Sequence, residues 1–274
     1  MRAIIAHLPP SPACRNNTCG MNPVFPAPVV GPFEAATSAI SAIIYIGVAL
    51  AALAAAPRDP RVRLFLLLAA ANIVPYLTPV LFWMHGEEAQ FTKLLTLGLA
   101  LSATIGGLAL FHFMQTFPWR RPWIREHGRW LTAAYVVCPL VVTGLVVAAP
   151  AQLDEITPAF ALTVFVIGLP ALVLVGIVLP FAGLFSLYNS WLASKRFGVT
   201  AAQAPTLAIL VSQLAGGVLA ILIIPLLHFV LPVGPWITVA AGLVFAFGLL
   251  MPIAFAAAIW RYDVLQIDPR SAPF

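Results

Sequence analysis

The placement of the few charged residues constrains this chain more than any other feature. Seven long apolar stretches are separated by six short loops, and eleven of the 14 Lys and Arg residues fall in alternate loops and in the C-terminal tail. These eleven residues are Arg58, Arg61, Arg63, Arg120, Arg121, Arg125, Arg129, Lys195, Arg196, Arg261 and Arg270. Because short basic loops remain in the cytoplasm, the pattern predicts seven membrane spans with the N-terminus outside and the C-terminus inside.

The composition indicates the same class of protein. Hydrophobic residues make up 62% of the chain and charged residues 8%, whereas soluble domains average about 25% charged residues. A spanning helix needs about 20 apolar residues, so seven spans and their loops use nearly all 274 residues. We therefore expect an all-α integral membrane protein, with an extracytoplasmic segment 1–31, a seven-helix domain 32–262 and a short cytoplasmic tail 263–274. The predicted spans are Phe33–Ala56, Val62–Met84, Leu94–Phe117, Trp130–Ala149, Pro158–Leu192, Ala204–Leu231 and Pro235–Trp260.

Prolines in the second predicted span mark a candidate ligand pocket. Asn72, Pro75 and Pro79 lie in this span, and a proline within a span frees a backbone carbonyl that needs another partner. His85 and His228 are expected near the outer membrane face and are assigned to the same pocket. The structural alternative is that these polar residues form interhelical hydrogen bonds, which are worth about 0.6 kcal/mol each.

No motif indicates a cofactor, a metal or a catalytic group. Metal sites usually need three or four ligands in a tight spacing pattern, and the sequence lacks one. His112 and His228 are expected at opposite depths, which excludes a haem held by this pair, and His112 is expected to bond a carbonyl or a neighbouring helix. Lys93 and Lys195 lie at predicted membrane edges, so the last span cannot carry a retinal Schiff base. We expect a protein without a cofactor that is not an enzyme.

Two cysteines lie in the predicted outer segment. Cys14 and Cys19 are five residues apart, and a disulfide persists in an extracytoplasmic compartment. Their spacing is short, so the sequence leaves a disulfide and two thiols equally open.

Two segments at the predicted inner face carry a resemblance. The third span ends in FHFMQTFPWRRPW, residues 111–123, and the seventh in AIWRYDVLQIDP, residues 258–269. Together they resemble the exits of seven-transmembrane input regions at the N-terminus of bacterial sensor histidine kinases and related signalling proteins, although Asp263 and Gln266 depart from that pattern. The resemblance implies that inner-face residues couple a signal to an output. These residues are Phe117, Pro118, Arg120, Arg121, Arg261, Tyr262 and Asp268.

The sequence supports two classes of function. The resemblance implies a sensor or transducer in the bacterial cytoplasmic membrane, in which a lipid, quinone, small apolar ligand or partner span shifts the helices and a signalling protein reads the change. No phosphoacceptor-histidine box or ATP-binding motif is present, so we expect no output domain within this chain and no kinase activity. The alternative is an accessory structural subunit of a larger membrane complex, of the electron-transfer or photosynthetic kind. In both cases we expect the lipid bilayer and a protein as partners, and no nucleic acid.

Overall fold

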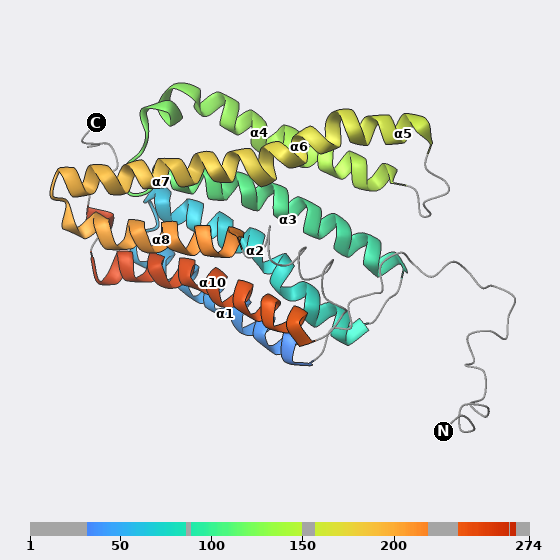
Figure 1. Cartoon of the computed structure of the whole chain (residues 1–274), viewed down its shortest axis with the longest axis horizontal. Coiled ribbons are helices and arrows are strands. Elements are labelled where there is room, and N and C mark those ends of the chain that lie inside the picture. The colour runs from blue at the N-terminus through green and yellow to red at the C-terminus, as the bar shows by residue number, and fades with distance from the viewer. Residues whose placement is uncertain (1–31, 86–88, 150–156, 219–234, 263, 267–274) are drawn as a thin grey trace, which may run out of the picture. The chain divides into compact units, whose positions relative to one another are not determined.

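The described part of the chain is built from helices alone. The computed structural model describes residues 32–85, 89–149, 157–218, 235–262 and 264–266, and every regular element among them is a helix (Figure 1). All of these residues belong to one compact unit, Gly31–Phe274. The predictions for Cys14, Cys19, His228 and Asp268 concern residues outside this part. The helices are α1 (Pro32–Ala55), α2 (Pro60–His85), α3 (Ala89–Thr116), α4 (Pro122–Ala148), α5 (Pro158–Thr163), η3 (Val164–Gly168), α6 (Leu169–Val173), η4 (Leu174–Val178), α7 (Leu179–Arg196), α8 (Thr200–Val218), α10 (Pro235–Trp260) and η6 (Val264–Gln266).

Several of these helices are suited to a membrane. Five in the described part are long and apolar enough to cross one, and Gly248–Trp260 is a shorter apolar helix. The five are Ala35–Ala55, Pro60–Leu81, Lys93–Thr116, Pro122–Ala148 and Pro158–Arg196. An all-α protein with several potential membrane spans is therefore confirmed.

Prolines set where helices start and where they depart from regular geometry. Pro122 begins α4, because the missing N–H of proline costs nothing in a first helical turn. The helix thus starts earlier than the predicted Trp130, and its first turn is separated from the rest by a kink at His127, where φ is −109° and ψ is 15°. In the long segment Pro158–Arg196, the π-helices η3 and η4 come directly before the pairs Leu169-Pro170 and Leu179-Pro180.

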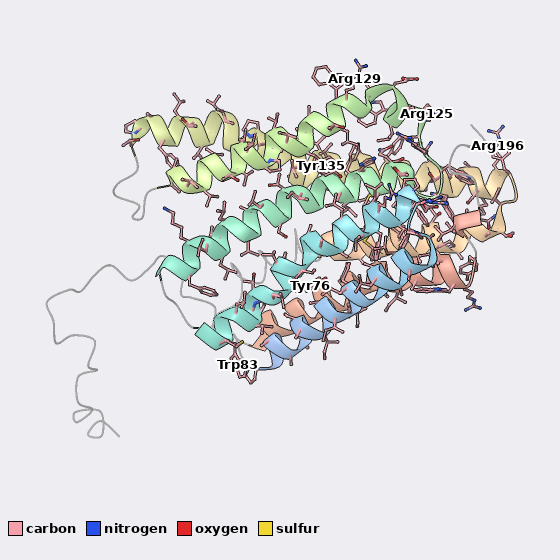
Figure 2. All side chains as sticks on the ribbon, turned by 180° about the vertical axis from the view of Figure 1, so that it is seen from behind. Tyr76, Trp83, Arg125, Arg129, Tyr135 and Arg196 are labelled. Atoms are coloured by element: carbon pink, nitrogen blue, oxygen red, sulfur yellow. The ribbon has the colours of Figure 1, made fainter. Side chains whose placement is uncertain are left out.

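The helices pack around a shared aromatic and aliphatic core. Helix α1 packs against α2 and α10, α3 against α2, α4 and α7, and α8 against α7 and α10. Helix α4 lies on the outer side of α3 and also contacts η3 (Figure 1). One end of the bundle holds the C-terminal ends of α1, α3, α7 and α10 and the N-terminal ends of α2, α4 and α8. We call it the Arg61 end. Arg125, Arg129 and Arg196 lie there, and Trp83 lies at the opposite end (Figure 2).

Candidate functional site

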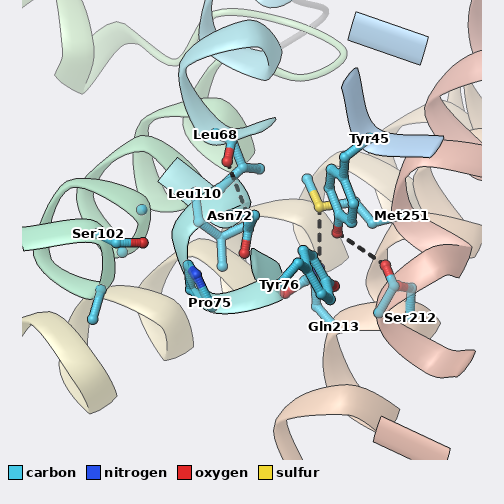
Figure 3. A pocket seen from close by; sticks show the side chains of 14 residues that line it. Tyr45, Leu68, Asn72, Pro75, Tyr76, Ser102, Leu110, Ser212, Gln213 and Met251 are labelled. Carbon is cyan, nitrogen blue, oxygen red and sulfur yellow. Dashed lines mark hydrogen bonds between the residues drawn. The ribbon is translucent and has the colours of Figure 1, made fainter. Parts of the chain in front are cut away.

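A cavity of about 390 Å³ lies between five helices. Figure 3 shows its lining from close by. Its wall is formed by residues of α1, α2, α3, α8 and α10, so the cavity brings together helices that are far apart in the sequence. The lining residues are Tyr45, Leu68, Asn72, Pro75, Tyr76, Ser102, Ala103, Gly106, Gly107, Leu110, Ser212, Gln213, Gly248 and Met251.

Pro75 explains one polar contact in the cavity wall. Proline has no backbone N–H, so the carbonyl of Ala71, four residues earlier, loses its regular helical donor. The hydroxyl of Ser102 on α3 donates to this carbonyl instead. Gly106, one turn after Ser102, faces the same residue of α2: a Cβ there would lie 3.4 Å from the Cβ of Ala71, which is ordinary van der Waals contact.

Pro252 in α10 produces a second contact of the same kind. It deprives the carbonyl of Gly248 of its donor, and the hydroxyl of Tyr45 on α1 donates to that carbonyl over 2.9 Å. Both proline-freed carbonyls are thus satisfied by hydroxyl groups from neighbouring helices. Since an unsatisfied carbonyl in a bilayer costs several kcal/mol, these contacts explain how the cavity wall tolerates two prolines.

Two amides also belong to the polar lining, as do the side chains of Tyr76 and Ser212. The Nδ2 of Asn72 donates to the carbonyl of Leu68 over 2.8 Å, and the Nε2 of Gln213 donates to the Sδ of Met251 over 3.2 Å. None of the described lining residues is Asp, Glu, Lys, Arg or His. The described wall therefore carries no formal charge, and most of its surface is apolar.

The predicted pocket residues fall into three groups. Asn72 and Pro75 line the cavity, whereas Pro79 lies in α2 but does not. His85 ends α2, and the position of its side chain is outside the described part. His228 is outside it entirely. A ligand pocket at Asn72 and Pro75 remains a prediction, now with a described cavity at that place.

A fully buried arginine organises the Arg61 end. Arg61 pairs with Asp59, with 2.7 Å between Nη2 and Oδ2, and the carboxylate of Asp59 also accepts from the backbone N–H of Arg61 over 2.8 Å. The guanidinium donates to three backbone carbonyls, those of Pro118 at 3.1 Å, Val264 at 3.0 Å and Leu265 at 3.2 Å. One side chain thus joins the start of α2, the segment after α3 and the turn η6 after α10.

Arg121 forms a second node at the same end. Its guanidinium donates to the carbonyl and hydroxyl of Ser186, at 2.7 and 3.1 Å, and to the hydroxyl of Ser190 at 3.0 Å. Ser186 in turn donates to the side-chain oxygen of Gln115 over 3.1 Å. Burial lowers the pKa of Arg121, but guanidinium groups in proteins stay protonated. Arg121 therefore ties the start of α4 to α7 with a charged group.

The structure separates the predicted coupling residues. Phe117 and Pro118 are buried, and a cis peptide bond joins them. Arg120 and Arg261 are exposed, and the guanidinium carbon of Arg261 lies 5.8 Å from the ring of Tyr262. Asp268 lies outside the described residues. By sequence Arg61 is only one of several loop charges, although Asp59-Pro60 directly before it is a signal for a helix cap beside an arginine.

Aromatic rings connect the cavity with the Arg61 end. The ring of Tyr45, in the cavity wall, lies 6.4 Å from that of Phe65, and Phe65 stacks on Phe255 at 4.1 Å. The ring of Phe255 lies 6.3 Å from that of Phe117. Phe117 directly precedes the proline whose carbonyl accepts from Arg61. Centroid distances of this size are those of interacting aromatic pairs, so a continuous series of contacts runs between the two sites.

His112 and Tyr135 form an unusual pair between α3 and α4. Their ring centroids lie 6.2 Å apart, and both His112 Nδ1 and the Tyr135 hydroxyl are buried without a hydrogen-bond partner in the described part of the chain. By sequence His112 is expected to bond a carbonyl or a neighbouring helix, and its Nδ1 does neither within the described residues.

Two further sources of information on function are metal-binding clusters and similar proteins, and neither identifies a chemistry for these sites. Within the described ranges, no group of three or more His, Cys, Asp and Glu residues is arranged to hold a metal ion. In comparisons with known proteins, no family model, no curated protein and no solved structure matches the chain.

Proposed function

We infer that this chain is a non-catalytic sensor or transducer module of the bacterial cytoplasmic membrane. It crosses the membrane seven times with its N-terminus outside, so the Arg61 end faces the cytoplasm. A small molecule in the cavity changes the packing of α2, α3 and α10, and a signalling protein reads the change at the Arg61 end. The sequence resemblance to seven-transmembrane input regions supports this assignment, as does the basic character of the loops.

The observation that carries the proposal is the connection between the cavity and Arg61. Asn72 and Arg61 lie on the same helix, eleven residues and therefore about 16 Å apart at 1.5 Å per residue. The aromatic contacts through Phe65 and Phe255 span the same interval. Packed interiors switch between discrete arrangements and do not deform continuously. A change in the cavity wall can therefore shift the rings packed against it, and through them the carbonyls that accept from Arg61.

Transduction requires two states with different ligand affinity. The exit turn η6 is suited to report them, because two of its carbonyls accept from Arg61 and Val264 is buried. In one state this turn is held against the bundle, and in the other the contacts of Arg61 are rearranged. The partner protein distinguishes the two states at this surface.

Amide hydrogen exchange measured by mass spectrometry tests this coupling. Ala103 lines the cavity, and Ala103→Phe is expected to occupy part of it and to change exchange at 117–121 and 264–266. Ala133 on α4 is exposed, so Ala133→Phe is the matched control. Adding Phe65→Leu is expected to abolish the effect of Ala103→Phe. Wild-type exchange at both segments in Ala103→Phe, or the same change in Ala133→Phe, contradicts the proposal.

Cysteine labelling in intact cells tests the topology. With Cys14, Cys19 and Cys138 replaced by Ser, single cysteines are introduced at Trp83 and Phe197, which are exposed at opposite ends of the bundle. A membrane-impermeant maleimide is expected to label Trp83→Cys in intact cells and Phe197→Cys only after lysis. The reverse result would invert the orientation.

An accessory structural subunit is the second candidate, because one flank of the bundle makes few internal contacts. Only 6% of the spanning window is buried in Pro122–Ala148, and the same holds for Pro158–Arg196. A partner subunit on this flank would cover these apolar faces. Purification from the native membrane, with an absorption spectrum and mass spectrometry of co-purifying proteins, separates the two candidates. Stoichiometric pigment- or haem-bearing subunits favour the structural role, and a soluble signalling protein favours the transducer.

A further inference from the structure

We propose that the exposed face of α4 binds an anionic phospholipid, with its phosphate at Arg125 and Arg129 and its acyl chains along the apolar residues that follow. This inference goes beyond the proposed function and does not rest on it, because it concerns which lipid contacts the bundle and not how the bundle responds to a ligand. Three observations carry it: the uncovered apolar face of α4, the position of Arg129 on that face, and the surplus of positive charge where the helix begins.

One face of α4 is uncovered in the described part of the chain. Val136, Leu140 and Val147 are 56%, 66% and 60% exposed, and their spacings of four and seven residues place them on one side of the helix. We call these three residues the α4 stripe. The opposite side of the helix carries Leu131, which packs with Phe111 of α3. Acyl chains are as apolar as the side chains of the α4 stripe, so this face is suited to contact with lipid.

Arg129 continues the α4 stripe toward the Arg61 end. It lies seven residues before Val136, after the kink at His127, and is exposed on the same side of the helix. The interval from Arg129 to Val147 corresponds to about 27 Å at 1.5 Å per residue, which is close to the thickness of about 30 Å of the bilayer hydrocarbon. A bilayer that covers the α4 stripe therefore places Arg129 at the level of the headgroups. Trp130, next to it, is 74% exposed, which is typical of an aromatic anchor at that level.

The start of α4 carries a surplus of positive charge. Segment 120–129 contains four arginines and one glutamate. Arg121 is held by hydroxyl and carbonyl groups of α7. Arg125 and Arg129 are exposed where the helix begins (Figure 2), and neither forms an ion pair within the described residues. Glu126 is the only acidic residue of α4, so the net charge of this surface attracts an anion.

A phospholipid matches both parts of this surface. A guanidinium binds a phosphate through two parallel hydrogen bonds. Because the α4 stripe begins two turns after Arg129, a phosphate at the arginines continues directly into acyl chains along the helix. An acidic segment of a protein would supply the charge but no chains for the α4 stripe. A basic residue near a membrane surface favours an anionic lipid by about fivefold, so an anionic headgroup fits better than a zwitterionic one.

Photo-crosslinking of the full-length chain in lipid nanodiscs tests the inference. The nanodiscs contain equal amounts of phosphatidylglycerol and phosphatidylcholine, and one of the two at a time carries a diazirine in an acyl chain. Cross-linked peptides from residues 131–148 are quantified by mass spectrometry. Phosphatidylglycerol is expected to cross-link at least about fivefold more than phosphatidylcholine, because two arginines act together and salt screens part of their attraction.

Two double variants that lose the same charge separate this site from general attraction. Arg125→Gln with Arg129→Gln is expected to make the two lipids cross-link equally. Arg58→Gln with Arg261→Gln is the matched control and is expected to preserve the preference. Arg58 and Arg261 are also exposed at the Arg61 end, but Arg58 lies in the loop before α2, and Ala254, two turns before Arg261, is buried. All four side chains are exposed, so neither double variant is expected to change the melting temperature.

A single substitution provides a test in the opposite direction. Glu126→Gln removes the one acidic side chain of α4 and is expected to increase the preference for phosphatidylglycerol. An excess of soluble glycerol phosphate is expected to leave the preference unchanged, because it has no acyl chains to contact the α4 stripe. Loss of the preference in its presence would show that the arginines bind phosphate alone, and would overturn the assignment to a lipid.

Three other results would also overturn the inference. The first is equal cross-linking by the two lipids in the wild type, which would leave the arginines without a role in lipid selection. The second is a preference that both double variants lower to the same extent, because the attraction then belongs to the whole Arg61 end. The third is the absence of cross-links to residues 131–148 from either lipid, because another protein chain then covers the α4 stripe.

Discussion

Replacing Arg61 tests how the Arg61 end is held together. In Arg61→Met the side chain keeps a similar length and loses its charge and all its donors. The carboxylate of Asp59, only 13% exposed, is left without its ion-pair partner. The carbonyls of Pro118, Val264 and Leu265 each lose a donor. The turn η6 then has no polar link to α2 through residue 61.

The expected loss of stability follows from these contacts. Removing one partner of a buried ion pair typically costs about 3–5 kcal/mol, because the other charge is left uncompensated. The carbonyl bonds belong to the same guanidinium, so their loss is contained in this figure and is not added to it. For a chain of this length, 1 kcal/mol corresponds to about 2–4 °C in melting temperature, so the midpoint is expected to fall by about 6–20 °C. Arg61→Lys keeps the charge but lacks the planar fork of donors, and an intermediate value is expected.

Thermal unfolding of the purified protein in mild detergent, followed by intrinsic tryptophan fluorescence, provides the measurement. Arg63→Met is the matched control, because Arg63 lies two residues further along α2, is exposed, and its side chain donates to the carbonyl of Pro57 in the same loop. Its midpoint is expected to stay close to that of the wild type. If Arg61→Met shifts the midpoint no more than Arg63→Met does, Arg61 does not hold the three segments together.

Three further substitutions test the remaining polar contacts by thermal unfolding. Arg121→Ala is expected to cost about 1.5–3 kcal/mol, because charged hydrogen bonds to Ser186 and Ser190 are lost, whereas Arg120→Ala on an exposed side chain leaves the midpoint unchanged; equal effects would contradict the assignment of Arg121 as a node. Ser102→Ala is expected to cost about 0.6–1.7 kcal/mol of stability. The cost is expected to be smaller in a Pro75→Ala background, where a backbone N–H again donates to the carbonyl of Ala71. If the double-mutant cycle shows no coupling, the proline and the serine act independently. Tyr135→Phe removes a buried hydroxyl that has no partner among the described residues, so the melting temperature is expected to stay the same or rise. Tyr45→Phe removes the donor to the carbonyl of Gly248, so the melting temperature is expected to fall. A larger fall for Tyr135→Phe than for Tyr45→Phe would show that the Tyr135 hydroxyl has a partner in the membrane.

The sequence was sufficient for the class of fold, because the signals for it are local. An apolar stretch of about 20 residues must form a helix in a bilayer, since only a helix satisfies its own backbone there. Proline likewise acts within one turn, so a perturbed helix at Pro75 and an acceptor in need of a donor were both predictable. The predicted span begins at Trp130 and the helix that contains it begins at Pro122, because hydropathy marks the apolar part of a helix and not its more polar first turns.

What the sequence did not reveal depends on contacts between distant segments. The pair Asp59-Pro60 marks a helix start beside Arg61, but only the fold places the carbonyls of Pro118 and Val264 around its guanidinium. In the same way, Pro75 predicts that one backbone carbonyl loses its helical donor. That Ser102 donates to this carbonyl follows only from how α2 packs against α3. The sequence by itself determined which groups need partners, because that is a property of each residue and its near neighbours. Tertiary structure alone decided which partners they have, and it thereby set the shape of the cavity and the contacts in its wall.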